Sequence, residues 1–461
     1  MDTLVRVLYI IAFALFIYGL SGLTGPKTAV RGNKIAAAGM VVAVVATLLR
    51  VDHNWVLIVV GLIVGTVLGV PSARRVKMTA MPQMVALFNG VGGGAVALIA
   101  WSEFRTSDGF TGTPGHVVIA SMFAALVGSV SFWGSLVAFG KLQEILPGRP
   151  MGLGKAQQGV NALLLAASVA CAVVAGLGGA AQVWVILLLV LAAVLGVMVV
   201  IPIGGADMPV VISLLNALTG LSAAAAGLAL DNTAMIVAGM IVGASGSILT
   251  NQMAVAMNRT IPAIVAGGFG GGGALASGGD GEEARTVRST SASDAAIQMA
   301  YAAQVIVVPG YGMAVAQAQH AVKDMAKLLQ AKGVEVKYAI HPVAGRMPGH
   351  MNVLLAEADV AYDALKEMDE INDEFARTDV TLVIGANDVT NPAARTDPSS
   401  PIHGMPILNV DESRQVIVLK RSMNSGFAGI DNPLFYADRT TMLFGDAKKS
   451  VLEVTEELKA L

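Results

Sequence analysis

Long apolar runs fill the first 260 residues of the chain, and a different pattern follows them. An α-helix needs roughly 20 mostly apolar residues to cross the hydrocarbon core of a bilayer. The runs predict nine membrane spans, near residues 4–22, 35–50, 55–72, 82–101, 116–139, 160–179, 182–203, 208–229 and 233–256. No small-residue cleavage signal follows the first run, so we expect this span to be retained.

Beyond residue 293, short apolar runs alternate with helical stretches, a pattern typical of α/β domains. It predicts strands at 305–308, 334–340, 380–385, 407–410 and 416–420, and helices at about 313–331, 351–372 and 446–460. We therefore expect a polytopic α-helical membrane bundle followed by a doubly wound parallel sheet. The predicted domains are a membrane domain at 1–260, a glycine- and serine-rich hinge at 261–293 and a sheet domain at 294–461.

The composition supports a chain that lies in a lipid bilayer. Only 13% of its 461 residues are charged and 55% are hydrophobic, whereas charged residues make up about a quarter of an ordinary soluble domain. The net charge of -2 offers no basic face, so we expect no nucleic-acid partner. Cys171 is the single cysteine, which excludes a disulfide or a cysteine metal site within one chain.

The basic residues predict the orientation of the spans. Alternate loops hold Lys27, Arg31, Lys34, Arg74, Arg75, Lys77, Lys141, Arg149, Lys155 and Arg259. The loops on the other side hold only Arg50 and Arg105. Because cytoplasmic loops are enriched in lysine and arginine, we expect the N-terminus outside and the sheet domain in the cytoplasm.

Polar residues inside the spans are costly to bury in lipid and are therefore functional candidates. Those that line a candidate wet path are Asn89, Ser131, Ser135, Ser213, Asn216, Thr219, Ser222, Ser245, Ser247 and Asn251. No charged residue or histidine lies clearly at mid-membrane, so a proton path here would depend on water and amides. Asp207, in a short loop between two spans, has two interpretations that stay open: a helix N-cap or a functional group facing the sheet domain.

The strand at 305–308 runs into Gly310-Tyr311-Gly312, which opens a helix. This is the setting of the glycine turn in a Rossmann-like dinucleotide-binding domain, where the first glycine allows the turn and the second lets the backbone approach a pyrophosphate. Val315 takes the place of the third glycine. The strand from Val334 to His341 also lacks the acidic residue that binds the ribose of NAD, so the usual NAD site is disfavoured.

Lys420-Arg421-Ser422 ends a later strand and offers two cations and a hydroxyl, which suit the 2′-phosphate of NADP. A solvated strand end is the alternative interpretation of this triplet. Loops at 345–350 and 385–392 also follow strands, and such loops converge on one crevice in open α/β sheets. His341, His350 and His403 show no paired metal-ligand spacing, so we expect no metal site.

With these residues considered together, the sequence resembles the beta subunit of bacterial proton-translocating NAD(P) transhydrogenases over nearly its whole length. The motifs that carry the resemblance are Gly310 to Gln319, His341 to Val353, Gly385 to Asp388, Lys420 to Asn424 and Leu443 to Lys448. The resemblance implies an enzyme of the bacterial inner (plasma) membrane that normally makes NADPH. It also implies NADP(H) on this subunit, NAD(H) on a separate alpha subunit, and a dimer of alpha–beta units.

The resemblance also implies roles for individual residues. In the family the cofactor lies reversed relative to an ordinary Rossmann enzyme, which explains the absent acidic residue and places Tyr311 near the cofactor. Val343, Ala344, Gly345, Arg346, Met347 and Pro348 would contact the pyrophosphate, Asp388 the nicotinamide side as the catalytic position, and Lys420, Arg421 and Ser422 the 2′-phosphate. The other expected cofactor-binding residues are Gly310, Gly312, Gly385, Ala386, Asn387, Met423, Asn424, Ser425, Gly426, Phe427, Asp446 and Ala447.

Two positions depart from the family pattern. Asn89 occupies a place where some members have histidine, so Asn89 and Asn216 are expected to orient water instead of carrying a proton. Phe427 occupies a place where others have tyrosine, which removes a hydroxyl near the nucleotide. Ser245 is assigned to the proton path, and Asp207 and Arg259 are expected to transmit the state of the membrane domain.

The predicted chemistry is direct hydride transfer between two nicotinamides, in which the protein positions the cofactors and supplies no acid, base or nucleophile. A channel or transporter with a nucleotide-sensing domain is the main alternative. Neither a Thr-Val-Gly-Tyr-Gly filter nor a clear inverted repeat supports it. A membrane scaffold with a degenerate Rossmann-like domain leaves Lys420-Arg421-Ser422 unexplained.

Overall fold

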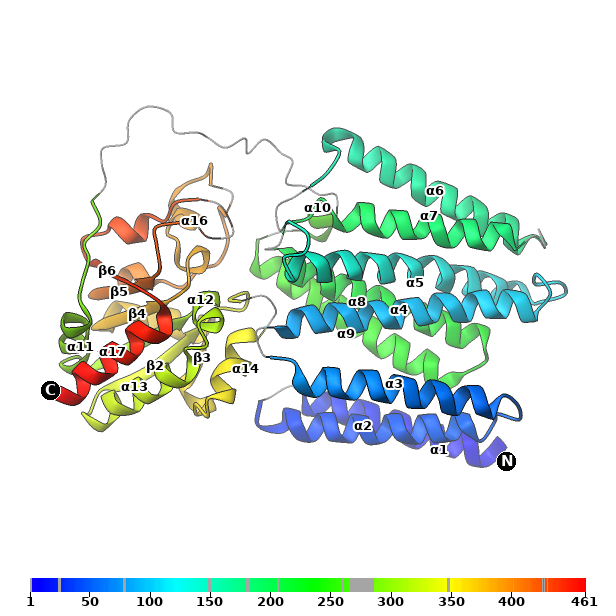
Figure 1. Cartoon of the computed structure of the whole chain (residues 1–461), viewed down its shortest axis with the longest axis horizontal. Helices are drawn as coiled ribbons and strands as arrows, with labels where there is room; N and C mark the ends of the chain where they lie inside the picture. Colours follow the sequence, from blue (N-terminus) through cyan, green and yellow to red (C-terminus); the bar gives the residue numbers. More distant parts are fainter. Residues whose placement is uncertain are drawn as a thin grey trace. The chain divides into compact units, whose positions relative to one another are not determined.

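The structure is a computed structural model, in which the chain forms two compact units. It describes residues 2–23, 26–77, 80–147, 151–178, 182–204, 207–258, 260–265, 286–345, 349–400, 402–424, 426, 428 and 430–461. One unit holds the apolar helices and the other holds the sheet (Figure 1).

Among the described residues, nine helices are long and apolar enough to cross a membrane, as the sequence predicts. They are α1 (Asp2–Gly22), α2 (Pro26–Leu48), α3 (Trp55–Arg75), α4 (Met81–Thr106), α5 (Gly115–Leu142), α6 (Gln157–Gly176), α7 (Val183–Val200), α8 (Met208–Ala229) and α9 (Thr233–Ala256). A short helix, α10 (Ile261–Val265), follows them. The predicted membrane bundle is therefore confirmed.

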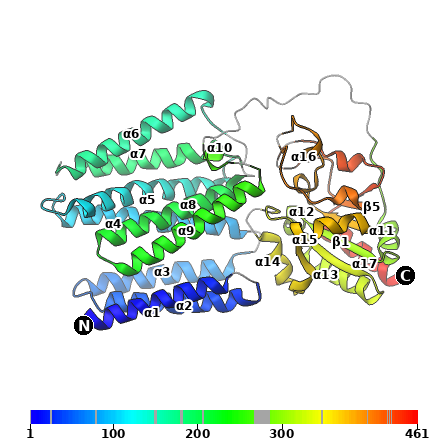
Figure 2. The ribbon, with the colours of Figure 1, turned by 180° about the vertical axis from the view of Figure 1, so that it is seen from behind.

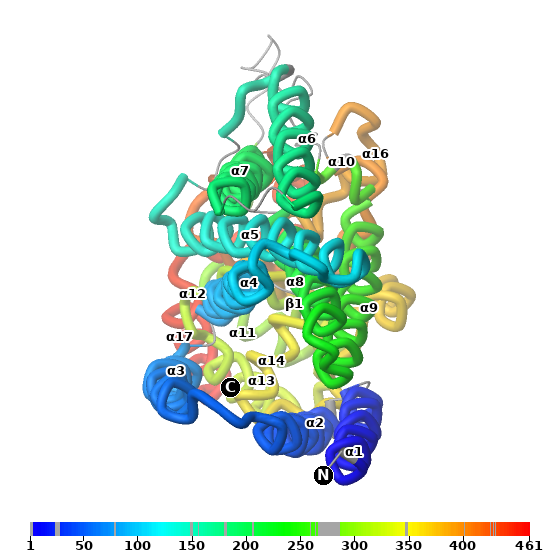
Figure 3. The backbone as a smooth tube through the Cα atoms, turned by 90° about the vertical axis from the view of Figure 1, so that its right-hand side faces the viewer, coloured from blue at the N-terminus to red at the C-terminus, as the bar shows by residue number. Residues whose placement is uncertain are grey.

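The spans differ widely in burial. In the most apolar 18-residue stretch of α5, 61% of the residues are buried, against none in the corresponding stretch of α3. The reason is that α5 packs on α4, α7 and α8 and lies between them (Figure 3). Glycines allow the close approach of α4 and α5, since a Cβ at Gly93 would lie 2.9 Å from the Gly128 carbonyl oxygen. The centre of the membrane unit is thus built around α5.

The second unit contains a six-stranded sheet in which every pairing is parallel. Its strands are β1 (Gln304–Pro309), β2 (Glu335–Ile340), β3 (Leu365–Glu367), β4 (Val380–Ile384), β5 (Gln415–Lys420) and β6 (Thr440–Phe444). Their order, β3-β2-β1-β4-β5-β6, is that of the dinucleotide-binding doubly wound fold. The predicted Rossmann-like domain is confirmed, and its strand order reverses between β1 and β4.

Helices and loops cover both faces of this sheet. The helices are α11 (Ala292–Ala300), α12 (Tyr311–Val315), α13 (Gln319–Ala331), α14 (His350–Glu357), α15 (Met368–Ile371), α16 (Ala393–Thr396) and α17 (Ala447–Ala460). On one face α17 packs against α11 and α13 (Figure 1). On the other, Ile306 and Val308 of β1 share a core with Phe375 and Phe435, and α15 lies on this side (Figure 2). Alternate strand residues therefore face two apolar layers.

Three predicted elements differ from the structure. The predicted helix at 313–331 is broken into α12 and α13, because Gln317 between them adopts a left-handed φ of 50°. The predicted helix at 351–372 is interrupted after Glu357: the chain turns at Asp359, with φ 56°, forms β3, and becomes helical again only in the short α15. Pairing of β3 with β2 overrides the helix propensity of that stretch.

The predicted strand at 407–410 is also wrong. Its residues are buried as a strand would be, but Leu408 N donates to the Val389 carbonyl oxygen at 2.9 Å and Asn409 N donates to Asn372 Oδ1 at 3.1 Å. These bonds join residues 407–410 to the loops at Val389 and Asn372, so the segment does not pair with a strand. The sequence prediction also lacks β6 and α11.

The segment before α11 continues the sheet beyond β6. Ser289 forms a parallel bridge with Met442. Met442 N donates to the Arg288 carbonyl oxygen at 2.7 Å, and Thr290 N donates to the Met442 carbonyl oxygen at 2.9 Å. Arg288 also forms an ion pair with Asp438 at 2.9 Å. Residues 288–290 therefore cover the open edge of β6.

Candidate functional site

The carboxyl ends of β1 and β4 lie side by side, because these strands pair directly where the strand order reverses. Gly310 N donates to the Ile384 carbonyl oxygen at 2.9 Å, and Gly312 N donates to the Gly385 carbonyl oxygen at 3.0 Å. Ligands of doubly wound sheets bind beyond the strand ends at such a reversal. The turn after β1 and the loop after β4 therefore form one candidate site.

Glycine is required where these two loops meet. A Cβ at Gly312 would lie 2.7 Å from the Cα of Gly385, and a Cβ at Gly310 would overlap the backbone of Gly385 and Ala386. Gly385 itself has φ +63° and faces the backbone of Gly312. The sequence predicts that the second glycine makes room for a pyrophosphate. In the structure, the backbone of the Gly385 loop lies beside this second glycine, Gly312.

Asn387 and Asp388, just beyond β4, bind the segment that follows β5. Asp388 Oδ2 accepts from Ala428 N at 3.0 Å. Asn432 Nδ2 donates to both the backbone oxygen and Oδ1 of Asn387, each at 3.1 Å. Two residues predicted to bind cofactor thus also order the loop beside the site.

Lys420, at the end of β5, is held within that same loop. Its Nζ donates to the Asn424 carbonyl oxygen at 2.6 Å and lies 4.5 Å from the centre of the Phe435 ring. Burial lowers the pKa of the Lys420 ammonium, and the negative charges of Asp388 and Asp431 partly offset this effect. Arg421 and Ser422 are exposed instead. The predicted phosphate-binding triplet therefore divides into one loop-bound cation and two exposed groups.

The loop after β2 starts at a buried histidine. His341 Nδ1 accepts from Val343 N at 3.2 Å, so Nε2 carries the proton and donates to the Pro406 carbonyl oxygen at 2.9 Å. Burial lowers the pKa of His341 to about 4. A neutral His341 therefore holds the start of the Val343–Gly345 loop. Gly345, with φ +103°, packs against the buried His350 ring.

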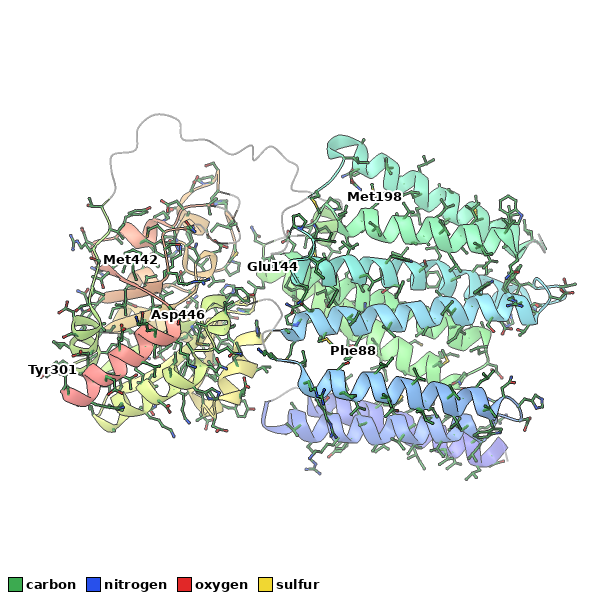
Figure 4. The ribbon with its side chains drawn as sticks, viewed as in Figure 1. Phe88, Glu144, Met198, Tyr301, Met442 and Asp446 are labelled. Atoms are coloured by element: carbon green, nitrogen blue, oxygen red, sulfur yellow. The ribbon has the colours of Figure 1, made fainter. Side chains whose placement is uncertain are left out.

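Asp446, labelled in Figure 4, directly precedes α17. Its carboxylate accepts from Lys448 N at 3.1 Å and Lys449 N at 3.2 Å, which makes it the N-cap of this helix. Gly445 N donates to the Lys420 carbonyl oxygen at 3.1 Å. The end of β6 is thereby joined to the end of β5, and Ala447 is buried beside it.

The structure joins the predicted residues in sets: the 310–312 turn with the Gly385 loop, and Asn387 and Asp388 with the segment after β5. Lys420 is joined to Gly445, which the sequence prediction does not assign to the site and which directly precedes the predicted Asp446. Predicted residues outside the described part of the chain are Arg346, Met347, Pro348, Ser425, Phe427 and Arg259. The sequence prediction does not assign Asn432 or Phe435 to the site. The Asn432-Pro433 pair, a turn signal, marks the place of Asn432.

In the membrane unit, a polar cluster joins three helices. Asn89 of α4 donates to Ser135 Oγ at 2.9 Å and to Ser131 Oγ at 3.4 Å, both on α5. Ser131 hydroxyl also bonds the hydroxyl of Thr219 on α8. Asn89 Oδ1 is buried without a hydrogen-bond partner among the described residues. A buried amide oxygen of this kind is a position for an ordered water.

Two other predicted path residues behave differently. Ser245 is turned back on its own helix, where its Oγ donates to the Val242 carbonyl oxygen at 3.2 Å. Asn216, on α8, is half-buried. Among the hydrogen bonds of the described residues, none joins Ser245 or Asn216 to the Asn89 cluster.

Asp207 occupies the N-cap position of α8 and is only 6% exposed. Its side chain makes no capping hydrogen bond, so the N-cap interpretation explains its place but not its carboxylate. Lys141 also differs from its predicted role as a loop charge. It lies inside α5, is 3% exposed, and donates to the carbonyl oxygens of Ile201 and Ile203.

The described residues contain no group of three or more histidine, cysteine, aspartate or glutamate side chains placed to hold a metal ion. What they contain is a helical membrane bundle and a sheet of the dinucleotide-binding order, with glycines at its reversal. These features define an integral membrane protein that carries a nucleotide-binding type of domain.

The comparisons with known proteins give the family. The chain belongs to the NAD(P) transhydrogenase beta subunit family, whose model matches residues 5–457. NAD(P) transhydrogenase subunit beta of Rhodospirillum rubrum is 47% identical over 458 residues, which cover 98% of each chain. The subunit from a separately named strain of that species matches equally. The predicted family and enzyme class are therefore confirmed, and the family binds nicotinamide nucleotides and has a partner alpha subunit.

Proposed function

We propose that this subunit binds NADP(H) at the carboxyl edge of its sheet and exchanges hydride with NAD(H) held by the alpha subunit. Movement of protons through the membrane unit drives the exchange toward NADPH. The nicotinamide groups supply the hydride chemistry itself, and the residues of this chain bind and orient them.

One observation carries the proposal: exposed Arg421 and Ser422 follow the strand next to the glycine-lined reversal. β4 and β5 pair in register up to Ile384 and Leu419, so both strands end at the same edge. An exposed guanidinium there suits a 2′-phosphate, and the glycines allow the turn after β1 and the loop after β4 to meet at this edge. The residues present therefore fit NADP(H).

Within this proposal Asp388 lies on the nicotinamide side and orders the loop through Ala428. Lys420 acts mainly by holding that loop, since its ammonium is bound to the Asn424 carbonyl oxygen. Tyr311, the Val343–Pro348 loop, Asp446 and Ala447 complete the pocket.

For the membrane unit, the proposed proton path runs through water held by the Asn89 cluster and by Asn216, with Ser245 beside it. Asp207 and Arg259 transmit its state to the sheet domain. One charge that crosses the membrane gains about 2.3 kcal/mol per 100 mV, which is enough to shift a two-state domain. The proposed assembly is a dimer of alpha–beta units in the plasma membrane of a bacterium, with the N-terminus outside and the sheet domain in the cytoplasm.

The test compares two arginines at opposite ends of β5. Arg421 follows the strand at the proposed site, whereas Arg414 precedes it and pairs with Asp379 at 2.8 Å. Titration calorimetry of the full chain in detergent should give tight NADPH binding and weak NADH binding. R421A should weaken NADPH binding about tenfold or more, because a charge-assisted phosphate contact is lost, and R414A should not. Equal effects of the two variants, or equal binding of NADH and NADPH, would contradict the proposal.

A further inference from the structure

A buried lysine connects the central span to the loop before Asp207. Lys141 Nζ donates to the Ile203 carbonyl oxygen at 2.7 Å and also to the Ile201 carbonyl oxygen. These oxygens lie just beyond the end of α7 at Val200, in the segment that leads to α8. Figure 4 labels Glu144 and Met198, which mark the ends of α5 and α7 on the same side of the membrane unit.

The Lys141 ammonium lies at the carboxyl end of α7, where a positive charge is stabilised. The last carbonyl groups of a helix have no partners within it and carry partial negative charge. Gln157 satisfies one of them, since its Nε2 donates to the Met198 carbonyl oxygen at 2.7 Å. Lys141, from α5, donates to the carbonyl oxygen of Ile201, the C-cap residue of α7, and to that of Ile203 just beyond it. Because a buried charge is stable only with such partners, lysine and loop hold each other in place.

The same helix carries the polar cluster. Ser131 and Ser135 of α5 bond Asn89, and Gly134 of α5 packs against Val200 of α7 and Leu215 of α8. Lys141 lies seven residues, or two turns, beyond Gly134, so it shares the face of α5 that packs on α7 and α8. A shift of α5 at the cluster would therefore also move Lys141 and the carbonyl groups that it bonds.

We propose that Lys141 is a positioning residue for coupling: through the carbonyl oxygens of Ile201 and Ile203 it holds the α7–α8 loop, and with it Asp207, in register with the Asn89 cluster. This inference rests on the proposed function and adds a residue to it. Asp207 N donates to the Gly204 carbonyl oxygen at 3.1 Å, so the position of Asp207 follows that of the loop.

The experiment uses the complete alpha–beta complex in sealed lipid vesicles. Hydride transfer between NAD(H) and NADP(H) is measured together with proton uptake by an internal pH dye, and the result is the number of protons moved per hydride. K141M should lower this ratio about fivefold or more, the range of a lost coupling between sites. K141R should keep more than half of it, and K34M, a change at an exposed lysine of α2, should leave it unaltered.

A purely structural role would lower both rates together and leave the ratio unchanged, and that result would overturn the inference. If K141M does not accumulate, K141Q replaces it: the amide can still donate to one carbonyl oxygen, so an intermediate ratio supports the inference and a wild-type ratio overturns it. A wild-type complex that moves no protons would overturn the proposed function as well.

A double variant tests whether Lys141 acts through Asp207. In a D207N background, K141M should cause little further loss, because the group that it positions is already altered. A further fivefold loss in that background would show that the two residues act independently, and would overturn the assigned route.

Discussion

The two units of this chain place their functional groups at different points of their secondary structure. In the sheet unit the candidate site lies where strands end, and main-chain contacts between Gly312 and Gly385 shape it. In the membrane unit the Asn89 cluster lies between three helices and is made mainly by side chains, with Ser131 Oγ also donating to the Leu215 carbonyl oxygen at 3.0 Å. A transmembrane helix satisfies most of its backbone groups internally, so contacts between spans depend mainly on side chains. Backbone changes should therefore dominate in the sheet unit and side-chain chemistry in the membrane unit.

The largest effect expected is that of G385A. A Cβ there would combine a left-handed φ of +63° with overlap onto the Gly312 backbone, and should cost about 3 kcal/mol of domain stability. Gly333 is the matched control: it has φ +88° but open space around it, so G333A should cost only about 1 kcal/mol. Denaturant unfolding of the sheet domain in the full chain measures both. Equal losses would show that close approach of the two loops contributes little.

The next effect concerns pH. His341 is buried and neutral with a pKa of about 4, whereas the unfolded chain protonates its histidines near pH 6.5. Stability should therefore fall as pH decreases through this window, by about 2 kcal/mol between pH 7 and pH 5. H341Q should flatten this dependence, while H320Q, at an exposed position on α13, should not. Unfolding curves at several pH values test this, and an unchanged slope in H341Q would refute it.

In the membrane unit, N89L should reduce proton movement about tenfold, because leucine can neither donate to Ser135 nor hold a water. NADPH binding should change little in the same variant. The control is T106A on the same helix, where Thr106 is exposed and bonds only the backbone of its own helix. If N89L weakened NADPH binding as much as proton movement, the contrast between backbone and side-chain sites would fail.

The smallest effect expected is that of D446A. The Asp446 side chain caps α17 through Lys448 N and Lys449 N, and loss of such a cap costs about 1 kcal/mol. D446N can still accept these bonds and should be nearly neutral. Thermal unfolding compares the two variants. A loss of NADPH binding in D446N with unchanged stability would instead assign the carboxylate charge to the site.

The sequence predicts the membrane bundle well because the bilayer sets the length of each span, so the apolar runs count the helices directly. The sequence predicts much less about which side of each helix is buried against its neighbours. Lys141 is an example: its position near the end of a span predicts a loop charge, and only packing of α5 against α7 shows that it is buried. Helix periodicity is weak in a span that is apolar on nearly every side.

In the sheet domain, local signals reveal the strands that run through the core but not those at its edge. β3 has only three residues and depends on its pairing with β2. The helix-favouring residues around β3 hide it from a prediction that uses local sequence alone. For the site, the glycine turn after β1 is a local signal and was predictable. The contacts of Asn432 with Asn387 and of Lys420 with Phe435 are not, because loop closure over many residues creates them.

The strand-like pairing of residues 288–290 with β6 affects how the sheet domain can be handled as a fragment. An uncovered parallel edge presents free amide and carbonyl groups, which promote association between copies. A fragment that starts at residue 294 would lose the bonds between Arg288, Thr290 and Met442, whereas one that starts before Val287 would keep them. The amide hydrogen of Met442 should exchange slowly with solvent in the longer fragment and rapidly in the shorter one.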